Sequence, residues 1–167
     1  PKPAARERQL VERTLESLSA QAKVTLVRGN HDRAFVRDFA GLGMAVTTEW
    51  RSGDVLAMHG DRLPDGCSEF LVLGHFHPSL AIEDNAGARQ RVPVFVYSRQ
   101  CLVLPAFSPY AAGWDLRRGI PAELQGWLKR GRRVVAISGK RVFPLMAKGA
   151  EKEASGSSDE MPRGAEC

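Results

Sequence analysis

The chain has 167 residues, of which 43% are hydrophobic and 26% charged, and its net charge is +5. This length supports one domain with a sizeable core, and the composition is that of an ordinary globular protein. No apolar run approaches the roughly 20 residues of a membrane span, and residues 1–13 lack the apolar stretch of a signal peptide. Three cysteines without CxxC spacing argue against a disulfide framework or a cysteine zinc site. We therefore expect a cytoplasmic globular protein that neither spans nor binds a membrane.

The charge is unevenly distributed along the chain. Residues 149–167 carry five acidic and two basic side chains and contain no Val, Ile, Leu or aromatic residue. This composition predicts a disordered acidic tail after a folded domain over residues 1–148. The domain itself then carries a net +8, which suits a phosphate-bearing substrate, including nucleic acid, although solubility alone also explains it.

The first half of the chain predicts alternating helices and strands. Residues 4–20 have helical spacing of leucine and valine, and the continuous apolar run at 24–27 predicts a strand that is buried on both faces. Asp32 can cap a helix over 33–40. The next expected strands are 45–49, 55–58 and 70–73.

The second half predicts an antiparallel meander. Apolar or alternating runs are separated by turn signals, and a hairpin with a two-residue turn closes the domain. The expected strands are 79–83, 92–98, 102–105, 133–138 and 141–145.

All four histidines follow expected strands directly. The motif GNHD at 29–32 follows the run 24–27, HGD at 59–61 follows 55–58, and GHFHP at 74–78 follows 70–73. An α/β protein presents its reactive groups at the carboxyl ends of such strands. Each motif alone is also typical of an ordinary turn or helix cap. Their recurrence at three strand ends favours one shared site.

The residue types at these ends predict a metal site. Asn30 offers an amide oxygen, and His59, His75 and His77 offer imidazole nitrogens. Oxygen and imidazole without thiolate suit Mn²⁺, Fe, Zn²⁺ or Ni²⁺ rather than Ca²⁺. A glycine beside each cluster lets the backbone turn sharply and approach closely.

The order GNHD, HGD, GHFH resembles the calcineurin-like metallophosphoesterase superfamily over about residues 24–145. The resemblance implies an α/β protein with a β-sandwich flanked by helices. It also implies hydrolysis of phosphate esters with two divalent metal ions, Mn²⁺ foremost.

The resemblance also implies a role for each matching residue. Asn30, His59 and His75 match the ligands of one metal, and His77 matches a ligand of the other. His31 matches the histidine that contacts the phosphate and assists the leaving group.

Asp32 would follow His31 as an orienting partner. Together the resemblance therefore names His31 and Asp32 as catalytic residues.

Two motifs of the superfamily, Asp-x-His and Gly-Asp, are absent upstream of residue 24. Each belongs to a βα unit of about 30 residues. We therefore expect on the order of 60 residues of the amino-terminal part to be missing, so that residues 1–148 are a partial domain with little activity alone.

Three later segments, 74–78, 91–95 and 102–108, resemble the branch that includes the ligase-associated DNA damage response endonucleases. This favours phosphodiester cleavage, with DNA as the favoured substrate and DNA repair as the context. Two alternatives stay open, namely a phosphatase or pyrophosphatase for a small metabolite, and a non-catalytic remnant that binds one metal or none.

Overall fold

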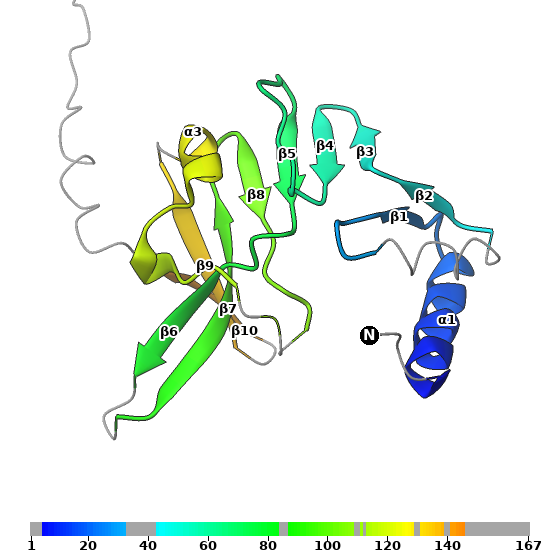
Figure 1. Cartoon of the computed structure of the whole chain (residues 1–167), viewed down its shortest axis with the longest axis horizontal. Coiled ribbons are helices and arrows are strands. Elements are labelled where there is room, and N and C mark those ends of the chain that lie inside the picture. The colour runs from blue at the N-terminus through cyan, green and yellow to red at the C-terminus, as the bar shows by residue number, and fades with distance from the viewer. Residues whose placement is uncertain are drawn as a thin grey trace, which may run out of the picture.

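The computed structural model describes residues 5–32, 43–83, 87–108, 111, 113–128, 131–138 and 141–145. These residues form a mixed eight-stranded sheet, a separate two-stranded sheet and few helices (Figure 1). The fold is thus α/β with sheet predominating. The predicted sandwich with flanking helices is not confirmed, because the described strands of the main body belong to one continuous sheet.

The elements follow the chain in this order: α1 (Ala5–Ser19), β1 (Thr25–Val27), β2 (Ala45–Thr47), β3 (Glu49–Ser52), β4 (Val55–Met58), β5 (Phe70–Leu73), β6 (Ser79–Glu83), β7 (Arg89–Tyr97), β8 (Cys101–Val103), the 3₁₀ turns η2 (Leu116–Arg118) and η3 (Ala122–Leu124), α3 (Gln125–Leu128), β9 (Arg133–Ser138) and β10 (Arg141–Leu145).

The large sheet has the strand order β10-β9-β7-β8-β5-β4-β3, and β6 pairs with β7. Its centre is parallel, since Met58 of β4 lies opposite Leu73 of β5, and Leu73 lies opposite Val103 of β8. The surrounding pairs are antiparallel. The parallel centre places the carboxyl ends of β4, β5 and β8 at one edge of the sheet.

The core lies on the central strands of this sheet. β5 and β7 alternate buried and half-buried residues, as strands do when one face is packed. The short α3 segment covers this face with Leu128, which is fully buried. Cys101 is fully buried and Cys67 half-buried, as expected for small apolar side chains. The fully or almost fully buried residues of the strands are Leu56, Leu71, Leu73, Val94, Val96, Cys101 and Val103.

The amino-terminal part is packed less tightly. β1 pairs in parallel with β2, and all three β1 residues are only half-buried. The prediction that this strand is buried on both faces is therefore wrong, because within the described residues β1 has a partner on one side only. On α1, Leu10 and Leu18 remain 67% and 49% exposed.

Most predicted strands are confirmed, five of them with the same bounds. The expected strand at 45–49 is instead two strands, β2 and β3, because the Thr47 hydroxyl bonds to both the N–H and the carbonyl of Glu49 around Thr48. β7 begins three residues earlier than predicted, because Arg89 pairs with Glu83 of β6. The predicted meander is interrupted, since β9 pairs with β7 rather than with β8.

The predicted helix at 33–40 and the predicted tail at 149–167 lie outside the described residues. The Arg141–Ser138 pairing is the register expected for a two-residue hairpin connection. In the described part of the chain, no helix combines the length and the apolar character of a membrane span.

Candidate active site

Two histidines meet where β4 and β5 end. His59 follows β4, and its carbonyl accepts a hydrogen bond of 3.0 Å from the N–H of Gly74, which follows β5. This bond holds the two strand ends together. His75 then adopts φ = 46°, a left-handed conformation that is uncommon for a residue other than glycine. The turn brings Nδ1 of His75 to 3.1 Å from Nε2 of His59, with the rings edge to face.

Asn30 reaches the same point from β1. Its Oδ1 lies 3.0 Å from Nε2 of His59. The approach depends on Gly29, since a Cβ there would lie 2.6 Å from the His59 ring. A hydrogen bond of 2.9 Å from the Arg28 N–H to the Thr47 carbonyl continues the β1–β2 pairing up to this loop. We call Asn30, His59 and His75 the donor trio.

The donor trio fits a divalent metal by its chemistry and its spacing. Imidazole nitrogens bind zinc-like cations at about 2.0–2.1 Å, so two ligands of one tetrahedral ion would lie about 3.3–3.4 Å apart. The trio's contacts of 3.0 and 3.1 Å are within a few tenths of an ångström of this separation. Within the described residues, no three His, Cys, Asp or Glu side chains form a group that could hold a metal ion. The third donor of the trio is therefore the Asn30 amide.

The local electrostatics favour neutral imidazoles, the form that binds metals. Burial lowers the pKa of His59, the nearby His75 lowers it further, and the carboxylates of Asp61 and Asp32 oppose the shift. Burial also lowers the pKa of His77, with smaller effects from His75 and His31. The lone pairs of these rings are therefore available near neutral pH.

His77 lies two residues after His75, and within the described part of the chain it makes no hydrogen bond or ring contact with the trio. Its backbone has φ = 46°, like that of His75. Residues 113–115 hold it in place, because a Cβ at Gly113 would overlap the His77 carbonyl oxygen. The Trp114 N–H donates to the carbonyl of Phe76, at 2.9 Å. The predicted ligands thus divide into the donor trio and a separately held His77.

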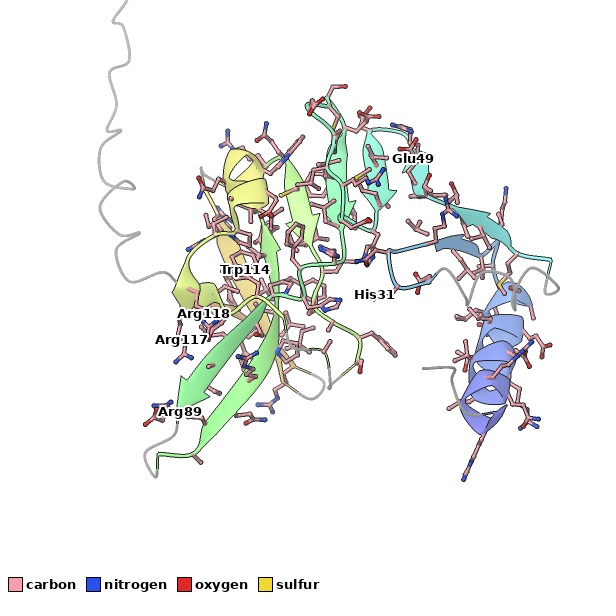
Figure 2. All side chains as sticks on the ribbon, in the orientation of Figure 1. His31, Glu49, Arg89, Trp114, Arg117 and Arg118 are labelled. Atoms are coloured by element: carbon pink, nitrogen blue, oxygen red, sulfur yellow. The ribbon has the colours of Figure 1, made fainter. Side chains whose placement is uncertain are left out.

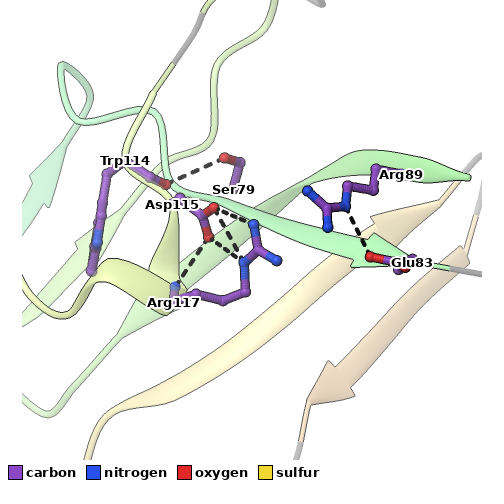
Figure 3. A network of polar contacts seen from close by, with 6 residues as sticks. All are labelled: Ser79, Glu83, Arg89, Trp114, Asp115 and Arg117. Carbon is purple, nitrogen blue, oxygen red and sulfur yellow. Dashed lines mark hydrogen bonds and ion pairs between the residues drawn. The ribbon is translucent and has the colours of Figure 1, made fainter. Parts of the chain in front are cut away.

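An ion pair between a buried carboxylate and an exposed guanidinium stabilises this supporting segment. Asp115 is 5% exposed and accepts hydrogen bonds from the backbone and the guanidinium of Arg117 (Figure 3). These bonds, chiefly the one from the guanidinium, lower the Asp115 pKa to about 2. The Trp114 carbonyl accepts from the N–H of Ser79 at 2.8 Å. This backbone bond links the segment before η2 to the start of β6, directly after residues 75–77, which we call the histidine turn.

His31 and Asp32 lie on the loop after β1. Figure 2 shows His31 on the side of the β1–β2 pair that faces the large sheet. The Asp32 carboxylate accepts a hydrogen bond of 2.6 Å from the Gly29 N–H, which closes the loop. The contact that the structure gives Asp32 is therefore with the backbone of the loop, and its orienting role toward His31 stays a prediction.

A polar cavity of about 600 Å³ opens beside the trio, between the β1 loop and the ends of β3 and β4. Arg28 and Arg62 line it together with Asn30, His59 and Asp61. The sequence prediction missed both arginines. Arg28 directly precedes GNHD and Arg62 directly follows HGD, so adjacency to the motifs was the available signal.

Comparison with solved structures gives an informative neighbour. No protein-family profile and no curated protein matches the sequence. Among solved structures, the chain is similar to the Pseudomonas putida nuclease MPE, with a TM-score of 0.59 and 29% sequence identity. The match covers 81% of this chain and 60% of the nuclease chain, so the protein spans less than two thirds of its neighbour. The fold described above is thus similar to that of part of a nuclease.

Proposed function

We propose that this chain is part of a metal-dependent phosphoesterase that hydrolyses phosphodiester bonds, with DNA as the favoured substrate. The observation that carries the proposal is the convergence of Asn30, His59 and His75, three metal-type donors from separate strand ends, at 3.0–3.1 Å. The 29% identity to a nuclease over 81% of the chain supports the phosphodiester class. The motif resemblance to the calcineurin-like metallophosphoesterases points the same way.

In this proposal the donor trio holds one divalent cation and His77 contributes to a second. Bound divalent cations stabilise charge on phosphoryl oxygens and acidify water. Mn²⁺ is the favoured ion, and Zn²⁺, Fe or Ni²⁺ suit the same donors. The low pKa values of His59 and His77 keep their rings able to bind.

The chain's other residues act on the substrate. Arg28 and Arg62 line the polar cavity, where their guanidinium groups pair with phosphate oxygens. His31, exposed on the loop beside the cavity, donates a proton to the leaving oxygen. Asp32 restrains this loop through the Gly29 N–H.

The test is a calorimetric titration of the chain with Mn²⁺, with a matched pair of histidine variants. His75→Ala should weaken Mn²⁺ binding strongly because it removes one of three donors, whereas His31→Ala should leave the affinity unchanged. Equal affinities for the wild type and His75→Ala would contradict the metal site.

Catalysis is tested on bis-p-nitrophenyl phosphate in the presence of Mn²⁺. The 167-residue chain should cleave this diester far more slowly than a version that also carries the Asp-x-His and Gly-Asp motifs. In that longer version, His31→Ala should lower kcat by about 10²–10⁴-fold, the usual contribution of a general acid. A His31→Ala variant that loses Mn²⁺ but keeps the rate would reverse the assigned roles. The alternative of a small-metabolite phosphatase is favoured if phosphomonoesters are cleaved and this diester is not.

A further inference from the structure

A second cavity is lined in part by His77 and is separate from the polar cavity beside the donor trio. It has a volume of about 260 Å³ and lies against the outward face of the β6–β7 ribbon. This is below the roughly 300–1,000 Å³ of pockets for drug-sized ligands, so it suits a fragment of about one nucleoside. We call it the His77 trough. Its lining residues are His77, Pro78, Ser79, Arg91, Pro93, Ala106, Phe107, Ser108 and Ala111.

The floor of the trough is apolar and rigid. Pro78 is fully buried, and Pro93 lies opposite Ser79 in the β6–β7 pairing. Ala106 continues the floor from the segment after β8. Proline and alanine side chains have almost no rotamer freedom. A flat ligand that packs against them therefore costs the protein little side-chain entropy.

Phe107 stands at the rim of this floor with its whole side chain exposed, at 108% relative accessibility. Isolated surface leucines are normal, but a fully exposed phenylalanine beside a cavity offers a stacking surface. Burial against a partner ring would remove its apolar surface from water. Nucleobases stack on such side chains because every base has a π-face.

Arg91 supplies the charge. On β7, Val92, Val94 and Val96 point toward the core, so Arg91 belongs to the opposite face, which lines the trough. Arg89 of the same strand pairs with Glu83 (Figure 3). Arg91, by contrast, has no carboxylate within ion-pair distance among the described residues. The positive charge of Arg91 makes a small contribution to lowering the pKa of Asp115. The ion-pair partner of that carboxylate is Arg117, not Arg91.

We propose that the His77 trough binds the nucleotide next to the scissile phosphate, with its base stacked on Phe107 and a flanking phosphate paired with Arg91. The inference rests on the proposed function, since His77, the proposed ligand of the second cation, lines the trough and lies two residues after His75 of the donor trio. An apolar floor, one aromatic face and a guanidinium without an ion-pair partner among the described residues match a base and its phosphate.

The test measures binding of fluorescein-labelled oligothymidylate, and of an abasic strand of the same length, by anisotropy with a metal chelator present. Phe107→Ala should weaken oligothymidylate binding by about 5- to 150-fold, the range of one lost stack, and leave abasic binding unchanged. Phe107→Trp should restore affinity. The matched control is Phe143→Ala, on β10 and 42% exposed, which should change neither.

Arg91→Ala should weaken both strands and lower the slope of log K against log salt by about 0.7, the value for one phosphate contact on a single strand. The matched control is Arg99→Ala, which removes one positive charge beyond the carboxyl end of β7. It should change neither the affinity for the two DNA strands nor the salt slope.

The subsite would be overturned if Phe107→Ala lowered the affinities for oligothymidylate and for the abasic strand equally. It would also be overturned if Phe143→Ala lowered the affinity for oligothymidylate as much as Phe107→Ala does. Wild-type protein that binds neither strand would overturn it too. The proposed function fails separately, if Mn²⁺ affinity does not depend on His75.

Discussion

The candidate site joins two regions that are packed very differently. The central strands β4 and β5 carry His59, His75 and His77 beyond their ends and contain fully or almost fully buried residues. The amino-terminal region, α1 with β1 and β2, supplies Asn30, His31 and Asp32 from a strand whose residues are all half-buried. Protein stability is rarely uniform, and loosely packed elements open first. The tightly packed sheet thus holds three imidazoles. The amino-terminal region adds the Asn30 amide from a less tightly packed strand.

The largest expected effect separates the two regions by stability. Leu71→Ala, at a fully buried site in β5, should lower the free energy of unfolding by about 2–5 kcal/mol. Leu26→Ala, half-buried in β1, should cost clearly less because less apolar surface is lost. Urea denaturation of both variants measures the difference. A larger loss for Leu26→Ala would mean that β1 belongs to the cooperative core.

This contrast also explains what the sequence could predict. β4 and β5, which precede three of the four histidines, were predicted with their bounds, because an apolar run that ends at a glycine or histidine is a local signal. The degree of burial of β1 was not predictable from its run Thr25–Val27, since burial depends on which strands pair with it. The insertion of β8 beside β5 is likewise a long-range pairing without a local signal.

The same limit applies to the site. The donor trio was predicted because each member lies in a recognisable motif, and its side chains do meet. Arg91, Phe107 and Gly113 were missed. They reach the histidine turn only through the β6–β7 ribbon and the segment after β8, and neither connection is written in the local sequence.

The second prediction compares two glycines that touch the site from different regions. Gly113→Ala should destabilise the protein by about 1–3 kcal/mol, because the new Cβ meets the His77 backbone, which cannot rotate away. Gly29→Ala meets only the His59 ring, so it should weaken Mn²⁺ binding with little loss of stability.

Thermal melts and Mn²⁺ titrations of both variants distinguish these outcomes. Gly66→Ala is the control, since no atom lies within 4 Å of a Cβ at that position. Unchanged melting of Gly113→Ala would show that the histidine turn is softer than its contacts indicate.

The third prediction concerns pH and the support of the histidine turn. The Asp115 pKa is about 2 in the folded protein against an ordinary value of 3.8, so its ionised form stabilises the fold. This contribution is complete above 3.8 and disappears as the pH falls toward 2. Asp115→Asn should therefore melt at a lower temperature than the wild type at neutral pH, and the two should converge in acid. A gap that persists near pH 2 would assign the effect to hydrogen bonding rather than charge.

The smallest effect is expected on α1. Leu10 is 67% exposed, so Leu10→Gln removes little buried surface and should change the free energy of unfolding by less than about 0.5 kcal/mol. Leu15, half-buried on the same helix, is the matched comparison, and Leu15→Gln should cost more because a polar amide then replaces packed methyl groups. Chemical denaturation at two protein concentrations measures both. If Leu10→Gln costs more than Leu15→Gln, the exposed face of α1 is covered in solution, and the amino-terminal region is more tightly packed than its contacts indicate. A cost that grows with protein concentration would identify the cover as a second copy of the chain, because only an intermolecular contact depends on concentration.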